Sequence, residues 1–132
     1  MPHYTQEQIA SIEKVRNIFA EIFQKRKDID LVYSEKAGYV LLYEIRFEQD
    51  RRLEMEPILI GDGAELFDFL LYEVACATFS KFGTMKDVHE ANKAEKEIVM
   101  RELVKYLEQA PEYRYLAERQ FISPLERRNE RS

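Results

Sequence analysis

The sequence has few residues that form disulfides or interrupt helices and strands. It contains one cysteine, no tryptophan, four glycines and four prolines among 132 residues. A single cysteine excludes an internal disulfide, so the fold must be stabilised by a hydrophobic core. Cys76 lies beside Val74, Ala75 and Ala77, and we expect a small buried thiol rather than a reactive one.

A long uninterrupted apolar segment is also missing. The longest apolar stretch, residues 64–79, contains Glu65, Asp68 and Glu73, which is not typical of a membrane span. The N-terminal MPHYTQEQ lacks the apolar centre of a secretory signal peptide. We therefore expect a cytoplasmic protein that has no membrane partner.

An excess of positive charge is absent as well. Lysine and arginine number 20 against 25 acidic residues, a formal net charge of −5. A general nucleic-acid binder needs a basic surface to displace phosphate counterions, so no nucleic-acid partner is expected. The chain is nevertheless 45% hydrophobic, which excludes disorder for most of it. The length indicates a single domain over residues 1–124, followed by a charged tail at 125–132.

Apolar residues at intervals of three and four predict helices towards both ends of the chain. The first begins at Thr5, which has capping-box spacing to Gln8, and ends in QKRKD. A second helix over 63–82 is apolar on nearly all sides, so we expect it to be central and buried, with Glu73 on a narrow solvent-touching stripe. A third helix follows from about residue 84, and a short fourth helix opens at Pro111.

Between these helices, residues 28–60 have a period of two, which predicts a three-stranded antiparallel meander. Gly38 suits the left-handed position of a three-residue turn. The register that we predict pairs Tyr33 with Leu41 and Ile45 with Met55, and it gathers the large apolar residues on one face. The expected fold class is therefore α+β, in the order α-β-β-β-α-α with a short final helix, and the meander packs on the central helix.

The stretch PILIGDGAELFDFLLYEV, residues 57–74, indicates a strand, a glycine turn and a helix start. A phosphate cradle offers free backbone N–H groups at a helix N-terminus, with no anion in the way. Asp62 occupies the cap position here, no lysine follows as in a P-loop, and the third glycine of a dinucleotide fingerprint is missing. We expect Gly61 and Gly63 to turn the chain and Asp62 to cap the helix.

In the predicted register, Asp30, Glu44 and Glu56 form one row on the outer face of the sheet. Carboxylates on neighbouring strands, about 4.8 Å apart, could hold a divalent cation. The simpler interpretation is a solvated face of interleaved charges. The row defines the alternative function, a metal-dependent hydrolase or nuclease-like enzyme.

The same register places five branched aliphatic residues on the outer face: Val32, Val40, Leu42, Ile58 and Ile60. Such a patch should not face water. Three covers are open: the segment 111–122, a second copy of the chain in a homodimer, or a different protein.

No cofactor motif and no catalytic constellation is apparent in the sequence. The function that we favour is that of a small acidic accessory or regulatory protein, not an enzyme, that acts through protein–protein contact. Its expected interface is the apolar patch.

Overall fold

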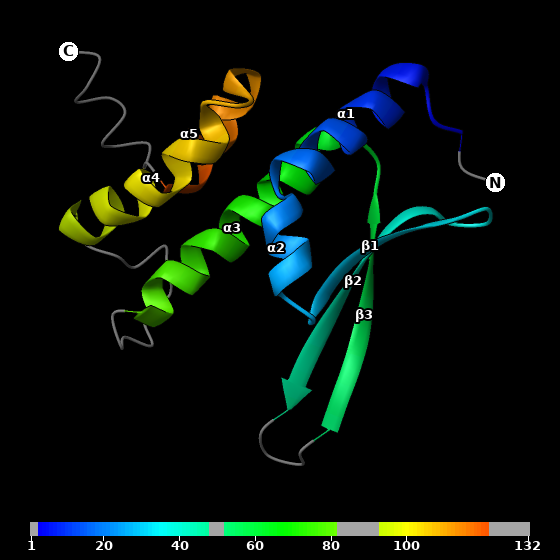
Figure 1. Ribbon diagram of the computed structural model, residues 1–132, viewed down its shortest axis with the longest axis horizontal. Coiled ribbons are helices and arrows are strands. Elements are labelled where there is room, and N and C mark those ends of the chain that lie inside the picture. The colour runs from blue at the N-terminus through cyan, green and yellow to red at the C-terminus, as the bar shows by residue number, and fades with distance from the viewer. Residues whose placement is uncertain (1–2, 48–51, 82–92, 122–132) are drawn as a thin grey trace. The chain divides into compact units, whose positions relative to one another are not determined.

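The computed structural model describes residues 3–47, 52–81 and 93–121, with side chains for 3–44, 57–78 and 94–121. The chain forms two compact units, Met1–Leu66 and Phe67–Ser132. The predicted tail at 125–132 lies outside the described residues. The elements are α1 (Gln6–Ile18), α2 (Ala20–Lys25), β1 (Ile29–Ser34), β2 (Gly38–Phe47), β3 (Arg52–Ile60), α3 (Gly63–Lys81), α4 (Lys93–Leu107), the 3-10 turn η2 (Pro111–Tyr113) and α5 (Arg114–Phe121) (Figure 1).

The first helix begins where the sequence predicts it. Thr5 Oγ1 accepts a hydrogen bond from the Gln8 N–H at 3.1 Å, and Gln8 Oε1 accepts one from the Thr5 N–H at 2.7 Å. This capping box satisfies two backbone donors that the helix itself leaves without partners. The predicted single helix, however, is interrupted at Phe19, where φ is −101° and ψ is 19°. Phe19 is fully buried, and no glycine or proline marks the break.

The three strands form an antiparallel sheet in the order β1-β2-β3, which confirms the α+β class and the meander. Gly38 has φ of 78°, the left-handed conformation predicted for it. The hairpin of β2 and β3 extends beyond β1, because β1 pairs with β2 only as far as Tyr43 whereas β2 pairs with β3 as far as Phe47 (Figure 1). The end of this hairpin is therefore a two-stranded ribbon.

The core of the first unit lies between α1 and one face of the sheet. Tyr39 on β2 donates a hydrogen bond from its hydroxyl to Glu13 Oε1 on α1 at 2.9 Å, which links the two elements. The residues of this unit that expose 2% or less of their surface are Ile12, Val15, Phe19, Ile29, Leu31, Leu41, Ile60 and Leu66. Every strand contributes to this face, so the opposite face of the sheet is the outer one.

Tyr4 closes the end of the β2–β3 hairpin that lies nearest to α1. Its hydroxyl accepts a hydrogen bond from the Tyr39 N–H at 3.0 Å and donates one to the Ile60 carbonyl at 2.8 Å. Tyr39 and Ile60 are register partners, so the hydroxyl bridges the last pair of this ladder. A Cβ atom on Gly38 would overlap the Tyr4 ring, which gives Gly38 a second reason to be glycine.

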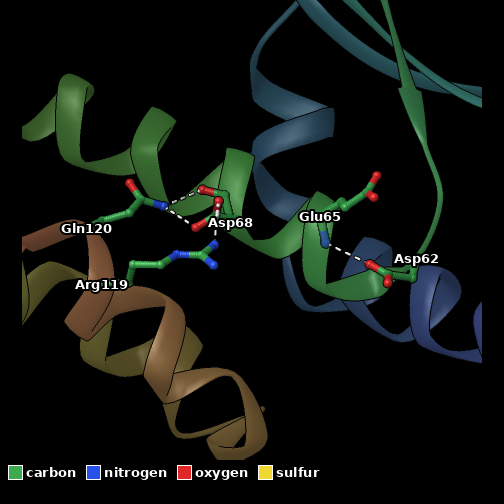
Figure 2. A network of polar contacts seen from close by, with 5 residues as sticks. All are labelled: Asp62, Glu65, Asp68, Arg119 and Gln120. Carbon is green, nitrogen blue, oxygen red and sulfur yellow. Dashed lines mark hydrogen bonds and ion pairs between the residues drawn. The ribbon is translucent and has the colours of Figure 1, made fainter.

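The second unit is helical and is held by polar and aromatic contacts between α3 and the segment η2–α5. Gln120 on α5 donates to the Asp68 carbonyl at 2.8 Å and also to Oδ1 of the Asp68 carboxylate. Arg119 lies 3.3 Å from the other carboxylate oxygen, and Figure 2 shows both side chains converging on Asp68. The rings of Phe67 and Tyr113 are 5.0 Å apart. Pro111 opens η2, which continues into α5, where the short final helix is predicted.

Helix α3 is buried on more than one side, as its composition predicts. Leu66 and Ala75 are nine residues apart, about two and a half turns, and so lie on opposite sides of the helix. Both are fully buried. The predicted solvent-touching stripe is wrong, because Glu73 exposes only 7% of its surface. Cys76 is a free thiol that is half-buried rather than fully buried.

Candidate contact surface on the outer face of the sheet

The strand register decides which residues share the outer face. Val32 pairs with Val40, and Val40 pairs with Leu59. Leu42 lies two residues beyond Val40 on the same strand and therefore on the same face. These four residues, Val32, Val40, Leu42 and Leu59, are called the outer patch.

The predicted placement of the five aliphatic residues on one face is thus correct for β1 and β2 and wrong for β3. Val32, Val40 and Leu42 share one face, as predicted. Ile58 pairs with Leu41 and Ile60 pairs with Tyr39, so both lie on the core face. Ile60 exposes 2% of its surface.

The physical reason is the length of one connection. Phe47 pairs with Arg52, which leaves four residues, 48–51, between the two strands. The prediction assumed a three-residue turn. Since side chains alternate between the faces, a change of one residue in the connection moves every β3 side chain to the other face. In the first hairpin the observed register is shifted by two residues from the predicted one, because Leu31 and not Tyr33 is opposite Leu41. A shift of two residues leaves every side chain of β1 on its predicted face.

The outer patch combines a buried centre with an exposed side. Val40 on the central strand exposes 6% of its surface, whereas Leu59 on β3 exposes 66%. Val32 and Leu42 are half-buried. An isolated exposed leucine is ordinary on a protein surface, but one that continues a row of aliphatic residues forms a patch with its neighbours.

Strand β3 is an edge of the sheet. The Glu44 N–H donates to the Asp28 carbonyl at 2.9 Å, so even-numbered residues of β2 direct their backbone groups towards β1. The odd-numbered residues of β2 therefore direct their backbone N–H and C=O groups towards β3. Pro57 is opposite the even-numbered Leu42, so its own backbone nitrogen points away from β2. A proline at such an edge position costs no ladder hydrogen bond and blunts the edge against pairing with another strand.

The acidic row predicted on the same face is not formed. Asp30 pairs with Leu42, Glu44 pairs with Met55, and Glu56 pairs with Tyr43. Glu56 is thus at a position of the opposite face, and Asp30 and Glu44 are in different rows. Among the described residues, no three histidine, cysteine, aspartate or glutamate side chains lie close enough together to hold a metal ion. The geometric basis of the metal-dependent alternative is therefore wrong.

Three backbone N–H groups at the glycine turn before α3 donate to side chains of the chain itself. Asp62 Oδ1 accepts from the Glu65 N–H at 2.9 Å, at the N-terminus of α3 (Figure 2), and Glu65 Oε2 accepts from the Gly61 N–H at 2.9 Å. The Gly63 N–H donates to Ser11 Oγ on α1 at 2.9 Å. The interpretation of this turn as a structural junction, rather than a phosphate site, agrees with these bonds.

Tyr4, Tyr33 and Tyr39 form an aromatic cluster at one end of the sheet, which the sequence analysis did not predict. The rings of Tyr33 and Tyr39 meet edge to face at 5.1 Å, and the rings of Tyr4 and Tyr39 do so at 5.5 Å. Burial raises the pKa of Tyr39, and the hydrogen bond to Glu13 raises it further. Tyr33, which was predicted to face the core, exposes 60% of its surface because it lies near the end of an edge strand.

Comparison of the chain with protein-family models, with curated proteins and with solved structures found no match. None of the helices in the described part of the chain is long and apolar enough to cross a membrane.

Proposed function

We propose that this chain is an accessory or regulatory protein that works by contact with another protein chain, and that the outer patch is its contact surface. The observation that carries the proposal is Leu59, which exposes 66% of its surface while it continues the aliphatic row of Val32 and Val40. Contiguous apolar side chains at a surface are typical of protein–protein contact sites.

The surroundings of the outer patch support the same function. Asp30 is exposed and lies in the row next to Val32, on the same face of the sheet. Protein interfaces commonly have an apolar centre and a polar rim, and the patch with Asp30 beside it has that composition. Because Pro57 blunts the β3 edge, we propose that the partner packs against side chains of this face rather than adding a strand to β3.

The size of the outer patch sets a requirement for the partner. A stable complex buries about 800 Å² on each partner, which is more than four aliphatic side chains supply. The partner must therefore also cover neighbouring surface, beginning with the exposed residues Asp30 and Pro57. A second copy of this chain and a different protein both satisfy this requirement.

The direct test is site-specific cross-linking in cells of the native host. A photoreactive p-benzoylphenylalanine replaces Leu59 in one variant and Tyr33 in the control variant, because Tyr33 on β1 is 60% exposed and lies at a position of the opposite face of the same sheet. We expect position 59 to give a discrete cross-linked product that position 33 does not give. Mass spectrometry of the product distinguishes a second copy of the chain from another protein. Equal, diffuse products from both positions would refute the proposed contact surface.

A further inference from the structure

We draw no further inference here: the strongest candidate, the outward backbone edge of β1 next to the outer patch, carries nothing because nothing in the structure shows what covers it.

Discussion

Leu59 lies directly opposite Val40 in the ladder between β2 and β3, yet Leu59 exposes 66% of its surface and Val40 only 6%. The two side chains point to the same face, so the difference in their exposed fractions arises from the positions of their strands in the sheet. Val40 is flanked by a strand on each side, whereas Leu59 is on the edge strand. A leucine that is this exposed contributes little to the stability of the fold.

Two matched substitutions measure how much an outer-face and a core-face leucine contribute to the free energy of unfolding. Leu59→Ala should change the free energy of unfolding by less than about 0.5 kcal/mol, because an exposed side chain leaves no cavity. Leu41→Ala, on the core face, removes a fully buried side chain and should cost about 2–5 kcal/mol. Urea unfolding followed by circular dichroism gives both values. Similar losses in the two variants would mean that Leu59 is packed rather than exposed.

The junction between α1 and α3 gives a second test. A Cβ atom on Gly63 would lie 2.6 Å from the Ser11 carbonyl oxygen, and backbone cannot move as a side chain can. Gly63→Ala should therefore lower the free energy of unfolding by about 1–3 kcal/mol through overpacking. Gly61→Ala is the control, since its Cβ would meet only the flexible Glu65 carboxylate, at 3.2 Å. Chemical unfolding of both variants should show a clear loss for Gly63→Ala alone, and equal stability of the two would contradict the close approach of the helices.

The pKa of Tyr39, raised by burial and further by its hydrogen bond to Glu13, predicts how stability depends on pH. The pKa of Tyr39 is raised in the folded state, so the folded chain holds this proton more tightly than the unfolded chain, where tyrosine titrates near pH 10. The stabilisation is fully present below about pH 10 and is lost as the pH rises through the folded pKa. Absorbance at 295 nm should show one tyrosine that ionises later in wild type than in Glu13→Gln, with Tyr39→Phe as the assignment control. If the titration is identical in wild type and Glu13→Gln, Glu13 does not raise the pKa of Tyr39.

The fold class was predictable because the periodicity of apolar residues changes sharply along the chain. Intervals of three and four give way to two after residue 28 and return after Gly63, and the elements follow these changes. The capping residues Thr5 and Asp62 have local signatures, because each bonds to a residue only three positions away. Signals of this kind lie within one turn of helix and can be interpreted without tertiary structure.

The candidate surface was predictable only in part, because the β2–β3 register depends on one connection. Leu53 and Met55 alternate with the charged residues at 52, 54 and 56 in the first half of β3, which favoured a core face made of odd-numbered residues that includes Leu59. Ile58 and Ile60 interrupt that alternation, and the four-residue connection selects them for the core side. The sequence pattern is thus compatible with both registers, and pairing with β2 decides between them.

The break at Phe19 and the burial of Glu73 have no local signal either. Phe19 fits the apolar periodicity of a continuous helix, but in the folded unit it is fully buried at the junction of α1 and α2. Glu73 is expected at a surface because of its charge, and its burial follows from how widely α3 is covered. Burial of this kind is a property of the folded chain and cannot be inferred from the neighbouring residues in the sequence.

The central claim is tested most directly by the affinity of the cross-linked partner for Leu59→Glu. A carboxylate within a dehydrated apolar contact should raise the Kd at least tenfold, about 1.4 kcal/mol, while circular dichroism shows the fold unchanged. Tyr33→Glu, which adds the same charge at an exposed position of the opposite face, should bind within about twofold of wild type. If Leu59→Glu binds as tightly as Tyr33→Glu, the outer patch is not the contact surface and the account is wrong.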